Sequence, residues 1–337
     1  MSSEIPKIRE LEQRIFGLDD EAEFEDISLQ VFRFQYASNP IYQEYCKLLK
    51  CAPAMVNRLE DIPFLPISFF KTHDIRSGGF EPEAVFESSG TTGSVNSRHA
   101  VKSLDLYRRS FMKGFEAFYG GVNQYCVLAL LPSYLERQNS SLVYMVKEWM
   151  EESSHPANAF YLDDRQALAR SLQMLENDVQ QTILVGVTYA LLDFAESYPM
   201  SLNNTIIMET GGMKGRREEL LRTEVHNRLK AAFGVSGIHS EYGMTELLSQ
   251  AYAIKEGKFR TPPWMKILVR EENDPKQLLR STPKSASGGL NVIDLANLYG
   301  CSFIATEDVC RLLPDGSFEV LGRLDHTDIR GCSLLSL

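Results

Sequence analysis

Short apolar segments alternate with helical patterns through the middle of this 337-residue chain. The spacing of apolar residues predicts strands at 84–87, 125–131, 182–186 and 205–209, and helices at 103–119, 139–152, 189–197 and 217–233. Such an alternation is typical of an α/β sheet, in which ligands bind at the carboxyl ends of the strands. We therefore expect an α/β core whose functional residues lie in the small-residue loops that follow its strands.

The chain on either side of this core follows other patterns. Residues 1–60 carry apolar residues at helical spacing, which predicts a helical segment. After about residue 250 the predicted strands are short, and they indicate a β-rich subdomain of the same domain (strands at 267–270, 303–306, 309–312 and 318–321). Residues 271–289 are charged and rich in Ser, Pro and Gly, so we interpret them as a surface loop. The expected boundaries are 1–60, 61–250, 251–325 and a tail over 326–337.

Composition excludes several classes of function. A formal net charge of −10 without a basic stripe argues against a nucleic-acid surface. The N-terminus lacks the pattern of a signal peptide, and the apolar stretch at 125–131 is too short to span a membrane. Six cysteines without a C-x-x-C pattern indicate neither a zinc site nor a disulfide framework. A reducing cytoplasm is the expected setting.

A Ser/Gly/Thr hexamer follows the first predicted core strand and has the composition of a phosphate-binding loop. Its glycines let the backbone approach a pyrophosphate, and its hydroxyls can donate to phosphate oxygens. It lacks the Gly-Lys-Ser/Thr of the Walker type, and a solvated turn is an equally good interpretation of the hexamer alone. Arg98 can add a positive charge. The six residues are Ser88, Ser89, Gly90, Thr91, Thr92 and Gly93.

A second motif, Tyr-Gly-Met-Thr-Glu at residues 242–246, offers groups that a nucleotide and its metal require. Tyr242 gives an aromatic face, Gly243 permits close approach, Thr245 offers a hydroxyl and Glu246 a carboxylate for Mg²⁺. The alternative is a turn at the end of a strand, with Thr245 capping the next helix.

Three weaker signals complete the pattern. Gly211 and Gly212 close a predicted strand, where an adenine can lie flat on the backbone or the chain can simply turn. Asp308 stands between two predicted strands and can hold ribose hydroxyls or remain solvated. Arg323 begins the last segment, where a surface ion pair is the alternative.

Taken in this order, the motifs resemble those of the adenylate-forming superfamily, which includes acyl-CoA synthetases, peptide-synthetase adenylation domains and luciferases. The resemblance covers roughly residues 60–332. The segment PFLPISFFKTH at 63–73, Ser97-Arg98-His99 and the terminal Arg-Gly-Cys resemble more narrowly the LuxE-type acyl-protein synthetases. The implied fold is the layered α/β N-terminal domain of that superfamily, with mixed sheets, helices and a β-rich subdomain. We expect the C-terminal lid domain of the superfamily to be absent, because only six residues follow Gly331.

The resemblance implies an enzyme that uses ATP and Mg²⁺ to convert a carboxylic acid, in this branch a fatty acid, into an acyl-AMP. By this resemblance the 88–93 loop holds the β- and γ-phosphates. Thr245 and Glu246 bind the α-phosphate and Mg²⁺, and Asp308 and Arg323 bind the ribose. Met244 belongs to the same ATP-binding motif. The acyl pocket is expected around Gly186, Val187 and Thr188 and the 132–140 turn.

The resemblance also implies that a cysteine near the C-terminus, Cys332, receives the acyl group and presents the thioester to an acyl-reductase partner. An unremarkable terminal thiol is the alternative interpretation of Cys332. Relatives supply a lysine from the lid to the adenylation step. In this chain the adenylation step must proceed without that lysine, or the positive charge must come from Lys71, Arg98 or a partner protein. Without such a role, Lys71 is expected to be an ordinary surface lysine.

Two other functions compete with acyl-protein synthesis. One is an acyl- or aryl-CoA ligase of the phenylacetate–CoA ligase type, which releases a small thioester. The other is a non-catalytic relative that binds a nucleotide or a partner protein. Glu246, Asp308 and Arg323 favour catalysis, because a protein that only binds a partner does not require them.

Overall fold

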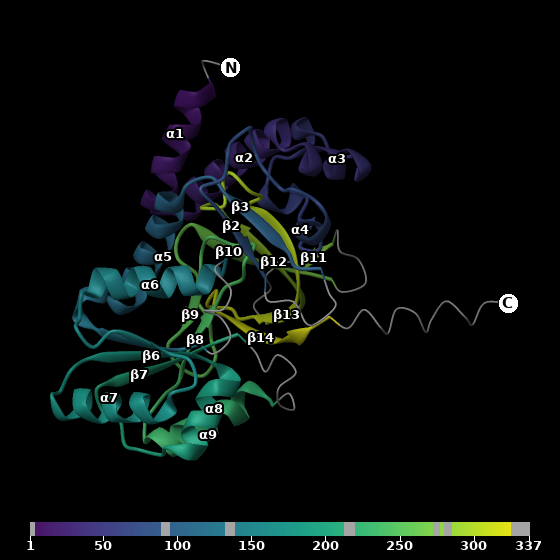
Figure 1. Ribbon diagram of the computed structural model, residues 1–337. Coiled ribbons are helices and arrows are strands. Elements are labelled where there is room, and N and C mark those ends of the chain that lie inside the picture. Colours follow the sequence, from purple (N-terminus) through teal and green to yellow (C-terminus); the bar gives the residue numbers. More distant parts are fainter. Residues whose placement is uncertain are drawn as a thin grey trace.

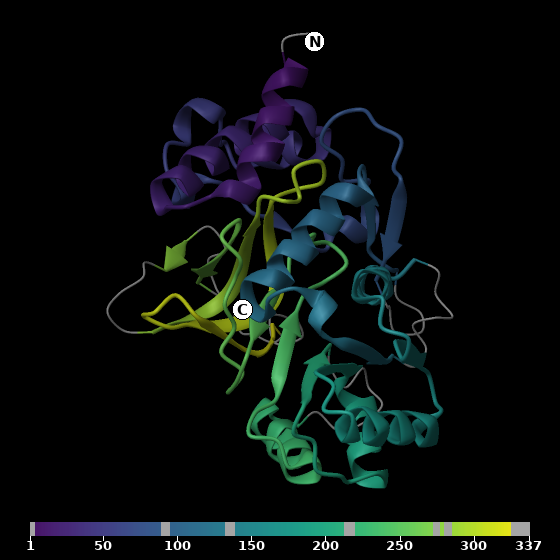
Figure 2. The same cartoon turned by 90° about the vertical axis from the view of Figure 1, so that its left-hand side faces the viewer.

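The computed structural model describes residues 4–88, 95–131, 139–211, 220–271, 277–279 and 285–324, with the side chains of 4–7 left aside. Figures 1 and 2 show the helices α1–α3 at one end of the molecule and α7–α9 at the opposite end, with the sheets between them. Within the described residues, no helix is both long and apolar enough to cross a membrane.

The N-terminal part is helical, as its apolar periodicity predicts. Asp20 caps the longest helix by accepting a hydrogen bond from the backbone N–H of Glu23. Buried Gln35 of this helix donates to the carbonyls of Asn297 and Leu298, which ties the helix to a distant loop. The elements are α1 (Glu4–Arg14), η1 (Ile15–Gly17), α2 (Glu21–Ser38), α3 (Pro40–Leu48), η2 (Pro53–Met55) and η3 (Leu59–Asp61).

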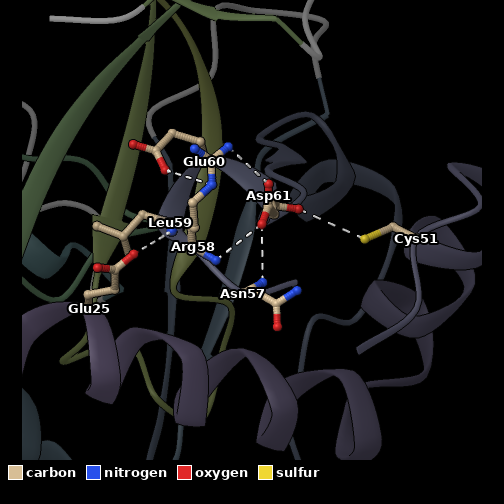
Figure 3. Close-up of polar contacts among 7 residues, drawn as sticks. All are labelled: Glu25, Cys51, Asn57, Arg58, Leu59, Glu60 and Asp61. Atoms are coloured by element: carbon tan, nitrogen blue, oxygen red, sulfur yellow. Dashed lines mark hydrogen bonds and ion pairs between the residues drawn. The ribbon is translucent and has the colours of Figure 1, made fainter. Parts of the chain in front are cut away.

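Two carboxylates, Asp61 of the helix itself and Glu25 of α2, stabilise the short helix η3 (Figure 3). The Asp61 carboxylate accepts hydrogen bonds from the backbone N–H groups of Asn57 and Arg58, both at 3.1 Å. Glu25 of α2 accepts one from the N–H of Leu59 at 3.2 Å. These contacts fix the chain immediately before it enters the first strand, β1 (Leu65–Pro66), and the short helix α4 (Phe69–Thr72).

The α/β core is a sheet with the strand order β5-β4-β6-β7-β8-β9. Neighbouring strands from β5 to β8 run parallel, so the carboxyl ends of β4, β6, β7 and β8 lie at one edge. Only in the pair β8–β9 is the direction antiparallel. The strands are β4 (Cys126–Leu130), β5 (Ala159–Tyr161), β6 (Thr182–Val187), β7 (Thr205–Thr210), β8 (His239–Tyr242) and β9 (Ala251–Ala253).

Helices connect these strands; the sequence predicts the helices before β4 and after β4, β6 and β7, but not the helix between β5 and β6. α5 precedes β4, α6 joins β4 to β5, and η4 lies just before β4. The predicted start of the last helix at 217 is wrong for residues 220 and 221, since the backbone of Leu221 is extended and the helix begins at Arg222. The bounds are α5 (Leu104–Tyr119), η4 (Val122–Gln124), α6 (Ser141–Ser153), α7 (Arg165–Asn177), α8 (Thr188–Ser197) and α9 (Arg222–Phe233).

A second sheet forms the β-rich part, with the order β1-β13-β12-β10-β11 and β14 paired to β13. The strands are β10 (Met265–Arg270), β11 (Leu278–Leu279), β12 (Ala286–Asp294), β13 (Phe303–Leu312) and β14 (Phe318–Arg323). The predicted strands 303–306 and 309–312 are one strand: Ala305 and Val309 pair with β12 on either side of a register shift, and Asp308 between them pairs with Arg323 of β14. The predicted 271–289 loop is likewise wrong at 278–279 and 286–289, which belong to strands.

A hairpin brackets the Ser/Gly/Thr hexamer. β2 (Ala84–Glu87) pairs antiparallel with β3 (Arg98–Val101), and Glu87 lies opposite Arg98. Beyond the strands, the N–H of Ser88 donates to the carbonyl of Ser97 at 3.0 Å, and the N–H of Ser97 donates to the hydroxyl of Ser88 at 2.8 Å. The two hydrogen bonds close the base of the connection. Of the hexamer itself, Ser89, Gly90, Thr91, Thr92 and Gly93 lie outside the described residues.

Candidate functional site

A cavity of about 110 Å³ lies at the carboxyl edge of the parallel sheet. Thr210 ends β7, and Glu241 of β8 is its register partner, so the two strands bring their last side chains together. The first turn of α6 and Tyr107 of α5 form another side of the cavity. The lining residues are Glu87, Tyr107, Ser140, Ser141, Leu142, Met145, Thr210, Gly211, Glu241, Gly243, Met244, Thr245 and Gln250.

The segment after β8 is a turn and not the start of a helix. The interpretation of Thr245 as a helix cap is therefore wrong. Instead, Asp294 holds the following backbone by accepting hydrogen bonds from the N–H groups of Leu248 at 2.7 Å and Ser249 at 3.0 Å. Asp294 is fully buried, and that burial raises the pKa of its carboxyl, while these hydrogen bonds oppose the rise.

His99 and Asn297 hold the backbone of Thr245 and Glu246. Asn297 Nδ2 donates to the carbonyl of Glu246 at 2.8 Å, which leaves its Oδ1 as an acceptor 3.0 Å from His99 Nε2. His99 Nδ1 lies 2.8 Å from the carbonyl of Thr245. Both ring nitrogens therefore face acceptors, so only an imidazolium satisfies both. Burial lowers the pKa of His99, and the two hydrogen bonds oppose that change.

Glu246 is a buried carboxylate at this site, with 5% of its surface exposed. Burial raises its pKa, while a hydrogen bond with Ser97 and the charges of Lys71 and Arg323 lower it. The Ser97 contact joins the hairpin base to the Tyr-Gly-Met-Thr-Glu segment. Lys71 is exposed on α4, as a surface lysine is expected to be, yet its charge acts on Glu246.

Tyr242 lies on the face of β8 opposite to that of Glu241, the cavity-lining residue before it in the strand. Its hydroxyl donates to Asp308 Oδ2 at 2.7 Å, and Arg323 Nε lies 3.6 Å from Asp308 Oδ1. Phe259 and Phe318 pack edge-on against the Tyr242 ring. The structure thus brings together Tyr242, Asp308 and Arg323, which are far apart in the sequence. Arg98 lies on β3 with an exposed side chain, 3.6 Å from Glu87 Oε1.

Two buried glutamates lie at the ends of β7 and β8, where Glu209 pairs in register with Ser240 and Glu241 with Thr210. Burial would raise the pKa of Glu209, but His226, whose Nε2 lies 3.5 Å from Glu209 Oε1, and the charge of Arg222 outweigh it, and the pKa is lowered. Glu241 accepts a hydrogen bond from the Thr210 hydroxyl, and burial raises its pKa to about 7. Repulsion from the Glu209 charge adds to this rise.

The predicted acyl-pocket residues lie one strand away from this cavity. Gly186 and Val187 end β6 and are buried in the sheet, and a Cβ on Gly186 would come within 2.8 Å of Leu191. The Thr188 hydroxyl lies within hydrogen-bond distance of two acceptors, Glu209 Oε2 at 2.8 Å and the carbonyl of Gly211 at 3.0 Å. Gly186, Val187 and Thr188 do not line the cavity, and their acyl role stays a prediction.

The remaining predicted site residues are Gly211, Gly212 and Cys332. Gly211 lines the cavity and has a positive φ of 69°, which glycine adopts without strain. Gly212 and Cys332 lie outside the described residues. Within those residues no cluster of three or more His, Cys, Asp or Glu can hold a metal by itself. Mg²⁺ does not require one, because one or two carboxylates and substrate phosphates suffice, and buried Glu246 fits that role.

Sequence patterns did not identify four residues of the site: His99 and Asn297 as supports of the Thr245–Glu246 backbone, and Glu241 and Gln250 in the cavity wall. Glu241 stands directly before a motif that sequence reasoning did identify. Its position beside Thr210 depends on pairing between β7 and β8, which no local pattern records.

The fold is that of the adenylate-forming ligases. A 2-hydroxyisobutyryl-CoA ligase in complex with 2-HIB-AMP superposes with a TM-score of 0.64 at 13% identity, covering 91% of this chain and 69% of the ligase. O-succinylbenzoate coenzyme A synthetase (MenE) from Bacillus subtilis, in complex with AMP, superposes with a TM-score of 0.51 at 16% identity, covering 71% of this chain and 49% of the synthetase. At these identities the likeness concerns the fold alone.

The sequence assigns the chain to one family within the class of adenylate-forming ligases. The profile of the family "Acyl-protein synthetase, LuxE" matches residues 17–336. The chain belongs to this family. No curated protein matches it by sequence.

Proposed function

We propose that this protein is an ATP-dependent ligase that activates a carboxylic acid as an acyl-adenylate and transfers the acyl group to a protein thiol. Membership of the acyl-protein synthetase family supports the reaction class. The observation that carries the proposal is the position of the segment after β8, where Thr245 lines the cavity and the next residue, Glu246, is buried. Tyr242 and Asp308 are joined on the opposite face of the strand.

In the first step, a carboxylate oxygen attacks the α-phosphorus of ATP, and the bond to pyrophosphate breaks. This reaction depends on alignment and charge neutralisation more than on proton transfer. Thr245 would contact the α-phosphate, and Asp308 with Arg323 would bind the ribose hydroxyls. The hexamer between β2 and β3 would bind the β- and γ-phosphates, and Gly211, Gly212 and Met244 would border the adenine.

Glu246 is the residue that would hold Mg²⁺. The ion supplies neutralisation of phosphate charge when it is bound. The chemistry of the donor supports this role, since a buried carboxylate that forms no ion pair with the described residues is costly and a cation relieves the cost. His99 and Asn297 orient this carboxylate indirectly, by fixing the backbone of residues 245 and 246.

In the second step, the thiolate of Cys332 would attack the acyl carbonyl, form a thioester and release AMP. The substrate that the family resemblance implies is a fatty acid, and the partner that would consume the thioester is an acyl reductase. A reducing cytoplasm fits an acceptor that must remain a free thiol.

A second candidate is a CoA ligase, because the two structural neighbours are named as ligases of coenzyme A. A non-catalytic nucleotide-binding protein is the third. The CoA ligase predicts that acyl-CoA appears when CoA is added and that the protein itself carries no acyl group.

The test of activation is ATP–pyrophosphate exchange with a panel of carboxylic acids. We expect exchange that depends on the acid and on Mg²⁺, and a large loss in Glu246→Gln. Glu116→Gln, an exposed change on α5, is the matched control and should exchange like the wild type. Absence of exchange with every acid, in folded protein that binds ATP, would favour the non-catalytic alternative.

A further inference from the structure

The pairing of β12 with β13 is irregular beside the carboxylate that we assign to the ribose. Ala305 and Val309 of β13 pair with residues of β12 that are only two positions apart. Three residues of β13, 306–308, therefore lie opposite the single residue Leu290, and the last of the three is Asp308. We call these three residues the 306–308 bulge. Such bulges redirect side chains and are common next to active sites.

A buried arginine of β10, Arg270, holds this bulge against β12. Its Nη1 donates to the carbonyl of Leu290 at 2.7 Å and to Asn291 Oδ1 at 2.8 Å. Its Nη2 donates to the carbonyl of Thr306, the first residue of the bulge. A planar guanidinium carries several donors in a fixed geometry, so one side chain can bind both strands at once. Arg270 therefore ties the start of the bulge to the residue of β12 that lies opposite it.

Thr306 connects this support to Asp308. The backbone N–H of Asp308 donates to the Thr306 hydroxyl at 3.1 Å. That hydroxyl donates in turn to the carbonyl of Leu290 at 2.9 Å, which is the carbonyl that Arg270 also binds. The backbone of Asp308 is thus linked to Arg270 through one intervening residue, while its carboxylate accepts the hydrogen bond from Tyr242.

The buried position of Arg270 is costly, and the chain makes room for it. Its residue is 6% exposed, and its three acceptors named above are all neutral. Burial lowers the pKa of Arg270, and the charge of the Asp308 carboxylate is among the influences that oppose this change. A Cβ on Gly289 would come within 2.6 Å of Arg270 Cζ, so glycine at that position leaves space for the guanidinium. An apolar side chain would fill the core at a lower cost, which favours a role for Arg270 in the site.

We propose that Arg270 is a positioning residue of the nucleotide site: it holds the 306–308 bulge and thereby keeps the Asp308 carboxylate where it accepts hydrogen bonds from the ribose hydroxyls. This inference rests on the proposed function, which assigns the ribose to Asp308. Arg270 acts on the nucleotide only through Asp308. A change at Arg270 should therefore weaken recognition of the ribose hydroxyls and leave recognition of the triphosphate unchanged.

The test is equilibrium binding of ATP and of 2′,3′-dideoxyATP to the full chain, measured by calorimetry with Mg²⁺ and without an acid. The wild type should bind ATP about tenfold to a hundredfold tighter, because the dideoxy nucleotide lacks both hydroxyls that donate to a charged acceptor. Asp308→Ala and Arg270→Lys should each reduce this preference to less than about threefold, and Arg270→Lys should leave the affinity for dideoxyATP unchanged. Arg311→Lys, the same change on an exposed arginine of β13 that pairs with Glu319, should keep the preference.

The possible outcomes separate the inference from the proposed function. A wild-type preference in Arg270→Lys, or an equal loss of preference in Arg311→Lys, would overturn the inference. If Arg270→Lys does not fold, Gly289→Ala takes its place in the comparison, because it displaces the guanidinium without removing it. A wild type that binds both nucleotides equally would overturn the inference, while pyrophosphate exchange would leave the proposed activity standing. Loss of the preference in Arg270→Lys, without exchange for any acid, would sink the proposed function alone.

Discussion

The hydroxyl of Tyr242 donates a hydrogen bond to Asp308 Oδ2 at 2.7 Å, which joins the parallel sheet to the β-rich sheet at the candidate nucleotide site. The side chain of Arg323 lies on the other oxygen of the same carboxylate. One carboxylate thus connects β8, β13 and β14, and a ligand bound there would contact both sheets.

Asp308→Ala should raise the KM for ATP by about tenfold to a hundredfold, because it removes a charged acceptor for ribose hydroxyls. Initial rates of pyrophosphate exchange at varied ATP measure the change. Asp315→Ala is the control, since Asp315 is an exposed carboxylate in a turn of the same sheet, paired with Arg260. An unchanged KM in Asp308→Ala would remove Asp308 from the nucleotide site.

Most core strands and helices follow from local pattern, because a buried strand is a short apolar run and such a helix has one apolar face. β4 and β6 illustrate this, since every residue of both strands is buried. The elements β5, α7, β8 and β9 are not predicted. The unbroken strand β13 is not predicted either, because the polar residues Glu307 and Asp308 separate two short apolar runs. Pairing of Asp308 with distant Arg323 continues the strand between those runs.

The candidate site likewise contains residues that a local sequence pattern identifies and residues that only the folded structure reveals. Tyr242, Thr245 and Glu246 form a contiguous motif and could be identified from the sequence. Asn297 gives no signal, since an isolated asparagine is ordinarily a loop residue, and its contact with His99 spans 198 positions. Gln250 likewise gives no signal in the sequence, since only its burial in the cavity wall marks it as part of the site.

His99→Leu should destabilise the protein and weaken catalysis, since it removes the ring nitrogens that contact the Thr245 carbonyl and Asn297 Oδ1. We expect a loss of about 1–3 kcal/mol in the free energy of unfolding and a lower kcat for exchange. Urea denaturation and exchange kinetics measure the two effects. His155→Leu, on a half-buried histidine outside the site, should leave kcat unchanged. Equal kcat in both variants would mean that His99 does not position the turn.

Glu241 should make the protein less stable as the pH rises from 5 to 8. Its pKa is about 7 in the folded protein, raised by burial from an ordinary value of 4.5. Between these values the folded state holds a proton that the unfolded state has lost, so the free energy of unfolding falls as pH rises through this window. The full contribution is about 3 kcal/mol.

Glu241→Gln removes that titration, and its free energy of unfolding should depend less on pH than that of the wild type. Urea denaturation at pH 5 and pH 8 gives the comparison, and Glu116→Gln should retain the wild-type dependence. The same slope in Glu241→Gln and in the wild type would show that Glu241 is ionised throughout the range.

Lys71→Met should lower kcat for pyrophosphate exchange by at least about tenfold, with a smaller effect on the KM for ATP. Its charge already acts on Glu246, and a cation there can stabilise charge that develops during transfer to the α-phosphorus. Lys47→Met, an exposed change on α3, controls for loss of a surface charge. Equal rates in the two variants would return Lys71 to the role of a surface lysine.

The central claim is that the acid is activated and then passes to a thiol of the protein itself. Incubation with ATP, Mg²⁺ and a radiolabelled acid that supports exchange should label the wild-type chain, and hydroxylamine should release the label because it cleaves thioesters. Cys332→Ala should keep pyrophosphate exchange and lose the label. A label that persists in Cys332→Ala, or acyl-CoA formed on adding CoA while the wild-type protein stays unlabelled, would contradict the account.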